Sequence, residues 1–388
     1  MDEWSAVVLA GGIGSRLYPL TIEIPKPMVP VANKPMIDYN LELLRNAGIN
    51  GKIIIVTKYL HEEIRKYFKE SEHFNDLDII IPKVDPLDTA DAVRKVSDYI
   101  NTDNFIVSMA DIVTNLPLTD FMAFHREKDC IASITLKDVS YPRAFGVIML
   151  NQDSRIVLFL EKPLPQELGL ATLTFAKKET IRLQSNLVNT GIYAFKHKVL
   201  DILDTLTDLM DFGKHVFPYL AREYGIYGYE RLDYYWMDAG NPQTYLYTNW
   251  DVLRRWSFPY FPKATWEEDS IWWDGLRPEI PPTVRIVAPT VMGSNISLNN
   301  NTTIGPLVAI GENVNIGENT IIQSSVVWDN VEIGRNVSIK ETIICNDVSI
   351  PDDSKLTSGT VIAPHTHFKT ALSTKKGQIV ESVVENLR

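Results

Sequence analysis

The hydrophobic and polar positions of the first half of the chain alternate between short apolar runs and amphipathic stretches. Apolar runs typical of buried strands fall at residues 6–10, 52–56, 79–81 and 105–109. Stretches with helical periodicity lie between them, at residues 36–47, 61–70 and 89–100. Because strands built of unbroken Ile and Val are buried on both faces, this α/β alternation predicts a Rossmann-like, mixed and mostly parallel sheet with helices on both sides.

The pattern becomes more antiparallel after residue 130. Strands are predicted at residues 130–136, 145–150, 155–160 and 191–195, and the polar turn 151–154 joins two of them. Residues 164–184 carry little periodicity, and we interpret them as an insertion. A helix is predicted over 242–256, and the Pro- and Trp-rich residues 257–283 then mark a linker. Residues 1–256 are therefore predicted to form the first domain.

A six-residue period begins near residue 284. Aliphatic residues recur at Ile304, Ile310 and Ile316, and again at Ile321, Val327, Ile333 and Ile339. Several are followed by glycine, which we expect at the tight corners of a left-handed parallel β-helix. A β-sandwich would show turn signals every 8–12 residues instead. The β-helix is predicted over 284–372, followed by a tail, 373–388, with a helix starting near Lys375.

Composition and charge narrow the class of protein. Of the 388 residues, 45% are hydrophobic, which is enough to form packed cores. The 38 basic and 49 acidic residues give a net charge of −11, which argues against a nucleic-acid-binding surface. We see no apolar stretch long enough for a membrane span, and we expect a cytoplasmic protein. Cys130 and Cys345 are expected to be buried thiols.

A glycine-rich loop follows the first predicted strand. Gly11, Gly12 and Gly14 allow backbone amides to face an anion, and Arg16 adds a planar set of donors suited to phosphate oxygens. The loop is not a Walker A motif, because no Gly-Lys-Ser/Thr follows. It also lacks the third glycine of a dinucleotide-binding fingerprint, where Leu17 stands. A phosphate-binding loop of another kind is predicted.

Charged residues beside prolines or at strand ends complete the candidate site. Lys26 lies between Pro25 and Pro27, which restrict the backbone that carries its ammonium group. Asp111 follows the strand at 105–109, and Asp238 stands between a short aromatic strand and a helix. Two carboxylates from distant segments suit Mg²⁺, which takes few protein ligands besides phosphates and water. Lys162, before a proline at another strand end, adds a second cation.

Together these segments resemble the sugar-1-phosphate nucleotidylyltransferase (NDP-sugar pyrophosphorylase) family. The similarity extends over residues 6–250, and the hexapeptide region resembles that of the mannose-1-phosphate guanylyltransferase and glucose-1-phosphate adenylyltransferase branches. The motifs that carry it are Gly11-Gly12-Ile13-Gly14-Ser15-Arg16-Leu17 with Pro25-Lys26-Pro27, Thr89-Ala90-Asp91-Ala92, Phe145-Gly146-Val147, Glu161-Lys162-Pro163, Asn189-Thr190-Gly191 and Trp236-Met237-Asp238-Ala239-Gly240. The resemblance implies a catalytic domain that joins an NTP and a sugar 1-phosphate into an NDP-sugar and releases pyrophosphate.

The resemblance also implies a role for each matched residue. Arg16, Lys26 and Lys162 would be catalytic, and Asp111 and Asp238 would hold Mg²⁺. The nucleotide would be bound by Leu9, Gly11, Gly12, Gly14, Ser15, Arg16, Lys83, Asp88 and Thr89. The sugar phosphate would be bound by Gly146, Glu161, Lys162 and Asn189. We favour GTP and mannose 1-phosphate as substrates and a homo-oligomer, dimer or tetramer, formed through the β-helix, without nucleic-acid or membrane partners.

Alternatives follow from departures from the family pattern. Asp88 and Ala110 stand where glycine is usual, and Lys83 stands where some branches have glutamine. The chain could instead be an adenylyl-, uridylyl- or thymidylyltransferase for glucose 1-phosphate, or a non-catalytic regulatory subunit that binds nucleotide sugars. An acyltransferase activity of the β-helix is disfavoured, because His365 and His367 occur only at its end.

Overall fold

The computed structural model describes residues 3–139, 146–161, 186–275 and 278–381. The chain forms two compact units. The first unit comprises residues 1–12 and 40–236, and the second comprises 13–39 and 237–388. The phosphate loop is therefore divided: Gly11 and Gly12 belong to the first unit, and Gly14 and Arg16 to the second. Residues Lys162 and 164–184, for which the sequence predicts a catalytic lysine and an insertion, lie outside the described residues.

Over the described residues, the first unit is built on a mixed nine-stranded sheet with the order β10-β9-β11-β6-β1-β4-β5, in which β8 also pairs with β11 and with β12. The strands of this sheet are β1 (Trp4–Ala10), β4 (Ile53–Thr57), β5 (Ile79–Ile80), β6 (Asn104–Met109), β8 (Ala132–Asp138), β9 (Gly146–Leu150), β10 (Ile156–Glu161), β11 (Leu187–Lys196) and β12 (Tyr227–Glu230). Two further strands along the chain, β7 (Ile112–Thr114) and β13 (Trp236–Asp238), lie outside this sheet. Strand β1 pairs in parallel with β4 and β6, while β11 pairs antiparallel with β6. The predicted mostly parallel core and its antiparallel extension are both confirmed.

Helices cover both faces of this sheet. They are α1 (Met36–Asn46), α2 (His61–Glu70), α3 (Thr89–Arg94), α4 (Leu118–Lys128), α6 (Lys198–Thr205) and α7 (Phe217–Glu223). One buried cluster joins Val7 and Val107 of the sheet to Val93, Leu203 and Phe217 of α3, α6 and α7. On the other face, the ring of Trp4 lies 5.9 Å from that of His125 in α4. The predicted helix over 89–100 is interrupted: α3 ends at Arg94, and a 3₁₀ turn follows at Ser97–Tyr99.

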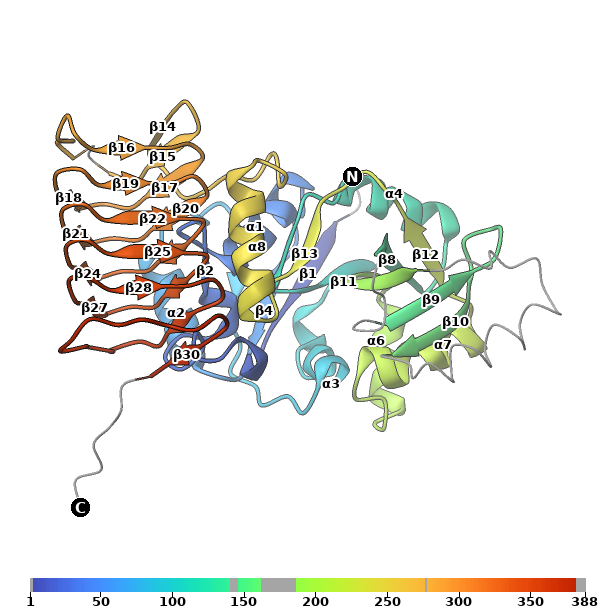
Figure 1. Ribbon diagram of the computed structural model, residues 1–388. Coiled ribbons are helices and arrows are strands. Elements are labelled where there is room, and N and C mark those ends of the chain that lie inside the picture. The colour runs from blue at the N-terminus through green and yellow to red at the C-terminus, as the bar shows by residue number, and fades with distance from the viewer. Residues whose placement is uncertain (1–2, 140–145, 162–185, 276–277, 382–388) are drawn as a thin grey trace, which may run out of the picture. The chain divides into compact units, whose positions relative to one another are not determined.

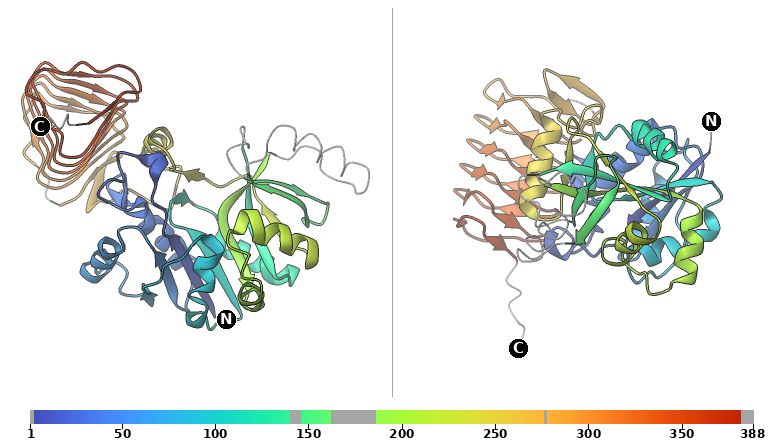
Figure 2. Two further views of the ribbon diagram at one scale, coloured as in Figure 1. Left: turned by 90° about the horizontal axis from the view of Figure 1, so that it is seen from below. Right: turned by 90° about the vertical axis from the view of Figure 1, so that its right-hand side faces the viewer.

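The second unit contains a parallel β-helix made of three sheets (Figures 1 and 2). The largest holds β14 (Trp266–Glu268), β15 (Ile271–Trp273), β17 (Thr290–Met292), β20 (Val308–Ile310), β23 (Val326–Val327), β26 (Ile343–Ile344), β29 (Val361–Ile362) and β30 (Ile379–Val380). The second holds β16 (Arg285–Ile286), β19 (Thr303–Ile304), β22 (Ile321–Gln323), β25 (Ser338–Lys340) and β28 (Lys355–Leu356). The third holds β18 (Ser297–Leu298), β21 (Asn315–Ile316), β24 (Glu332–Ile333) and β27 (Ser349–Ile350). The left view of Figure 2 shows the three-sided coil that these sheets form.

The inward-facing residues follow the hexapeptide period with one difference from the prediction. Ile322 is fully buried, whereas Ile321 is 44% exposed, so Ile321 was the wrong choice for the inward position. The length of one coil falls from 18 residues, between Ile304 and its partner Ile322, to 17 residues, between Ile322 and its partner Ile339. One five-residue side, from Ile322 to Val327, produces the shorter step.

The corners of the β-helix differ more from expectation. At two of the three corners of a coil, asparagine stands where we expected glycine and has a positive φ, as at Asn313 (56°) and Asn319 (57°). The side chains of equivalent asparagines are hydrogen bonded from coil to coil, for example from Asn301 Nδ2 to Asn319 Oδ1 at 3.1 Å and onward to Asn336 at 3.1 Å. Asparagine tolerates this conformation better than other side chains. Glycine has another use: a Cβ on Gly317 would lie 2.5 Å from the carbonyl carbon of Gly334 in the next coil.

The segments on either side of the predicted β-helix also belong to its sheets. Within the predicted linker, β15 pairs with β17, and Trp272 and Trp273 are buried, with the rings of Trp266 and Trp273 5.5 Å apart. Within the predicted tail, β30 replaces the start of a helix near Lys375, since Val361 pairs with Ile379. In both places, backbone pairing with an existing sheet decides the structure.

Two further expectations concern the thiols and the membrane. Cys130 and Cys345 are free and buried, as predicted. Over the ranges that the structure describes, no helix combines the length and the apolar character that crossing a bilayer requires.

Candidate active site

Gly14 brings the phosphate loop against Lys26 within the second unit. Its φ is +73°, and a Cβ there would lie 2.9 Å from Thr21 Cγ2 and 3.1 Å from Lys26 Cβ. The Thr21 hydroxyl donates to the carbonyl of Gly14 at 3.0 Å. The 3₁₀ turn Ser15–Leu17 follows, and Arg16 on it is exposed. Glycine is needed at position 14 for both its conformation and its packing.

Lys26 and Asp238 form the clearest pair of predicted functional residues. Lys26 begins a short 3₁₀ turn (Lys26–Met28) after Pro25 and is 6% exposed. Its Nζ lies 3.7 Å from Asp238 Oδ1. Both residues belong to the second unit, which brings together a buried ammonium from its segment 13–39 and a carboxylate from its segment 237–388. This lysine is not a freely solvated surface group.

Gly240 makes room for the Asp238 carboxylate. A Cβ on Gly240 would lie 2.8 Å from Asp238 Oδ1 and 3.1 Å from Oδ2. Directly afterwards, Asn241 caps α8 (Pro242–Leu253) in a capping box with Thr244. The fixed start of this helix holds the loop that carries Asp238. The sequence signal was the Asp-Ala-Gly-Asn-Pro run, whose glycine we had not assigned a role.

Asp111 lies at the carboxyl end of β6 in the first unit. There the Ala110 amide donates to the Leu9 carbonyl at 3.1 Å, and Leu9 pairs with Met109. Asp111 is thus next to the end of β1, where ligands bind in open parallel sheets. Ala110 is fully buried, so the methyl group at this usual glycine position is accommodated. Gly12 follows the same end of β1, and a Cβ on it would meet nothing within 4 Å.

The predicted metal site stays a prediction, because Asp111 and Asp238 belong to different units. In the described ranges, no cluster of three or more His, Cys, Asp or Glu could hold a metal ion. The donor set fits Mg²⁺ rather than a transition metal, since two carboxylates supply only oxygen.

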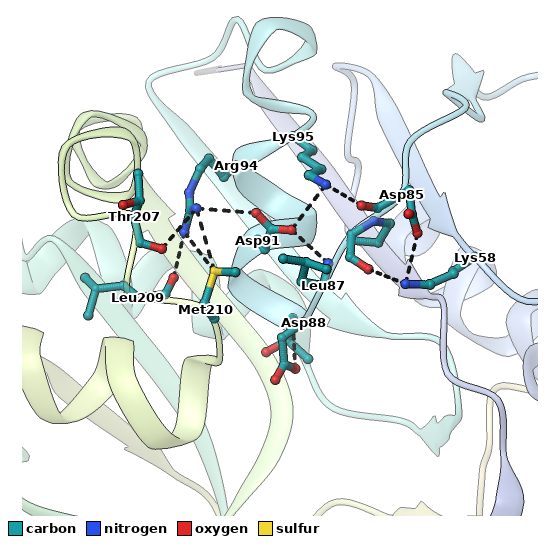
Figure 3. Close-up of polar contacts among 12 residues, drawn as sticks. Lys58, Asp85, Leu87, Asp88, Asp91, Arg94, Lys95, Thr207, Leu209 and Met210 are labelled. Carbon is teal, nitrogen blue, oxygen red and sulfur yellow. Dashed lines mark hydrogen bonds and ion pairs between the residues drawn. The ribbon is translucent and has the colours of Figure 1, made fainter.

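A hydrogen-bond network fixes the loop before α3, next to the predicted nucleotide-binding residues (Figure 3). The buried carboxylate of Asp91 accepts from the Leu87 amide at 2.8 Å and lies 3.3 Å from Arg94 Nη1 and 3.5 Å from Lys95 Nζ. Lys58 Nζ donates to the Pro86 carbonyl at 3.0 Å. It also lies 2.9 Å from Asp85, and it lowers the pKa of that carboxyl. We had not assigned roles to Asp91, Arg94 or Lys58.

The predicted nucleotide-binding residues in this region have different environments. Asp88 caps α3 by accepting from the Thr89 amide at 2.8 Å. The Thr89 hydroxyl donates to Asp211 at 3.3 Å and accepts from the Phe212 amide at 3.0 Å. Lys83 is exposed. A helix cap explains why an aspartate is favourable at position 88.

The predicted sugar-binding residues lie on adjacent strands. Gly146 on β9 pairs directly with Glu161 on β10, and Val147 pairs with Val188, one residue before Asn189 on β11. The Asn189 amide donates to Tyr193 Oη at 2.9 Å, and its carbonyl accepts from the Gly191 amide at 2.9 Å. The sheet register therefore brings three of the four predicted residues together; the fourth, Lys162, lies outside the described residues.

The chain thus combines an α/β unit, with a glycine-rich loop after its first strand, and a parallel β-helix. A family model described as nucleotidyl transferase matches residues 5–255, and one described as the EIF2B subunit epsilon LbH domain matches residues 279–373. The chain belongs to the nucleotidyl transferase family. The second match supports the left hand predicted for the β-helix.

Similar proteins carry the names of sugar-1-phosphate nucleotidyltransferases. Mannose-1-phosphate guanyltransferase of Schizosaccharomyces pombe is 32% identical over 248 residues, which are 62% of each chain. The mannose-1-phosphate guanylyltransferase catalytic subunit beta of Xenopus tropicalis is 31% identical, again over 62% of each chain. UTP--glucose-1-phosphate uridylyltransferase of Synechocystis sp. is 31% identical over 64% of this chain and 62% of its own. The chain thus matches less than two thirds of the length of these relatives.

Proposed function

We propose that the protein transfers a nucleoside monophosphate from an NTP to a sugar 1-phosphate, with GTP and mannose 1-phosphate as the preferred pair. The observation that carries the proposal is the pair formed by the buried Lys26 and the partly buried Asp238, with Gly14 packed against Lys26. A cation that is fixed beside a glycine-rich loop suits the charge that develops on a transferring phosphoryl group. The names of the relatives support this reaction class.

In the proposed mechanism, the loop amides and Arg16 bind the triphosphate. Gly11, Gly12, Gly14 and Ser15 offer their amides, and the exposed Arg16 guanidinium can reach the β- and γ-phosphates that leave as pyrophosphate. The open space beside Gly12 lets an anion approach the backbone closely. Leu9, Lys83, Asp88 and Thr89 would bind the rest of the nucleotide.

Lys26 would neutralise charge at the α-phosphate while the sugar phosphate attacks the α-phosphorus. The sugar phosphate is already an anionic nucleophile, so the residues need to position it rather than deprotonate it. Lys162 would grip that phosphate, and Gly146, Glu161 and Asn189 would bind the sugar hydroxyls. Asp111 and Asp238 would hold Mg²⁺, which neutralises phosphate charge when it is bound.

The alternative substrates are UTP or another NTP with glucose 1-phosphate. The name of the Synechocystis relative, at 31% identity, supports this second candidate. A cytoplasmic homo-oligomer, a dimer or tetramer joined through the β-helix, is part of the proposal, and light scattering at micromolar concentration tests the oligomer.

The test is pyrophosphate release by the purified chain with Mg²⁺, for four NTPs against several sugar 1-phosphates. GTP with mannose 1-phosphate should give the highest kcat/KM. The variant Lys26→Met should lower kcat by about 10²–10³-fold, the typical loss of one preorganised charge-stabilising donor. Lys66→Met removes an exposed lysine of α2 and serves as the matched control with unchanged kcat. Equal rates for the two variants would contradict the role of Lys26, and silence across all pairs would contradict the function.

A further inference from the structure

A buried hydrogen-bond chain joins the β-helix to the segment that carries Lys26. Trp328, which directly follows β23, donates from Nε1 to Tyr245 Oη at 2.9 Å. Tyr245, on α8, donates in turn to the Pro30 carbonyl at 2.5 Å. Tyr245 is fully buried and Trp328 is 4% exposed. Since a phenol can accept one hydrogen bond and donate another, its hydroxyl is used in both directions.

The strands β2 (Pro30–Val31) and β3 (Lys34–Pro35) form a hairpin whose turn depends on α8 and the β-helix. The turn residues Ala32 and Asn33 have φ values of 47° and 65°. A positive φ is unfavourable for alanine, so this turn needs support from outside the hairpin. The Ala32 amide donates to Oδ1 of the buried Asn249 at 2.7 Å, and Asn33 Nδ2 donates to the Ile310 carbonyl at 2.6 Å.

Helix α8 is therefore linked to both members of the Lys26–Asp238 pair. Asp238 precedes its N-cap, Asn241, by three residues. Pro30, held by Tyr245, follows Lys26 by four residues, and the turn between them is closed by the Val29 amide on the Lys26 carbonyl at 3.2 Å. Burial raises the pKa of Tyr245, so its hydroxyl keeps the proton that it donates to Pro30. A shift of Pro30 would be transmitted along this short segment to Lys26.

We propose that Tyr245 is a positioning residue through which the β-helix fixes the Lys26–Asp238 pair. The role rests on the proposed function and deepens it, because the β-helix would hold the catalytic lysine in position in addition to providing a surface for assembly. Trp328 supports Tyr245 from the β-helix, and Asn249, which lies on α8 as Tyr245 does, holds the hairpin turn. Removing the Tyr245 hydroxyl leaves the Pro30 carbonyl and the Trp328 indole without their partner, which loosens Lys26 while keeping the ring in the core.

The experiment compares the full-length variants Tyr245→Phe, Trp328→Phe and, as matched control, Tyr247→Phe, whose exposed hydroxyl accepts from Gln243 on the same helix. Tyr245→Phe should lower kcat about tenfold and change the KM for the NTP less than about threefold. Trp328→Phe, which leaves the bond to Pro30, should lower kcat about threefold, and Tyr247→Phe should leave it unchanged. An unchanged kcat in Tyr245→Phe would overturn the proposal.

Repeating the Tyr245→Phe substitution in a variant that lacks Lys26 separates positioning of that lysine from general destabilisation. In the Lys26→Met background, Tyr245→Phe should lower kcat no further, because the group that it positions is gone. An additional tenfold loss would overturn the proposal. If the wild-type chain turns over no substrate pair, the proposed function fails. Hydrogen exchange then still tests whether Tyr245 holds the segment that follows Lys26. The amides of Val29 and of residues 31–33 should exchange at least about tenfold faster in Tyr245→Phe than in Tyr247→Phe, and equal rates would overturn the proposal.

Discussion

The sheet of the first unit and the β-helix of the second unit both rely on parallel strand pairing, yet they use glycine for opposite purposes. At the end of β1, a Cβ on Gly12 would meet nothing within 4 Å, which leaves the backbone open to a ligand. In the β-helix, a Cβ on Gly317 would lie 2.5 Å from the carbonyl carbon of Gly334, so glycine lets one coil approach the next. Glycine therefore indicates binding in one region and packing in the other.

The regions also differ in how far along the chain strand partners lie. From Arg285 onward, parallel neighbours in the β-helix are 17 or 18 residues apart, as Ile322 is from Ile339 and Ile304. In the first unit, β1 pairs with β6, where Val7 lies opposite Val107. Long crossovers bring loops from distant parts of the sequence to one sheet edge, which suits a binding site, whereas the short repeat suits a rigid support.

The largest predicted effect on stability tests the two uses of glycine. Gly317→Ala should lower the free energy of unfolding by about 3 kcal/mol, because the new methyl group meets backbone that cannot move aside. Gly12→Ala should change stability by less than about 0.5 kcal/mol and should instead weaken NTP binding. Urea unfolding measures the stability of each variant, and a nucleotide-binding titration measures its affinity for the NTP. Similar stability losses in the two variants would remove the contrast.

A second prediction concerns a buried histidine in the first unit. Burial lowers the pKa of His125 to about 4, and its Nδ1 lies 2.9 Å from the Ser133 hydroxyl. Because the unfolded chain binds the proton near pH 6.5, the stability due to neutral His125 is present above that pH and lost as the pH falls toward 4. Between pH 7 and 4.5 the unfolding free energy should fall by about 2 kcal/mol more than in His125→Gln. The same pH dependence in both proteins would exclude this role.

The smallest predicted effect tests the asparagine ladder of the β-helix. Asn319→Ala places a less tolerant residue at a φ of 57° and removes side-chain hydrogen bonds in both directions, to Asn301 and to Asn336. Stability should fall by about 1–2 kcal/mol, while Asn319→Gly, which relieves the backbone, should cost less than half as much. Thermal unfolding of the two variants gives the comparison. A glycine variant as unstable as the alanine variant would show that the backbone conformation contributes little.

Much of the fold was predictable because local patterns decide it. Buried aliphatic runs defined β1, β4 and β6, and the six-residue period identified the β-helix. Its exact register was not predictable at Ile321 and Ile322, where both residues are aliphatic and a five-residue side follows. The helix expected near Lys375 also failed, because pairing of β30 with β29 outweighs local helical preference.

Part of the candidate site was predictable as well. Proline on both sides of Lys26 indicated a restrained cation, and its pairing with Asp238 agrees with that interpretation. The positioning role of Tyr245, supported by Asn249 and Trp328, was not predictable, since all three look like ordinary core residues in the sequence. Their role depends on which carbonyl or amide each side chain reaches, and only the three-dimensional arrangement reveals this.

The most direct test of the proposed reaction is ³¹P NMR of GTP and mannose 1-phosphate incubated with the purified chain and Mg²⁺. The account predicts that the triphosphate and sugar-phosphate resonances decline together while equal amounts of a sugar nucleotide and pyrophosphate appear. Unchanged resonances with GTP, and with each of the other nucleoside triphosphates and glucose 1-phosphate, would contradict it.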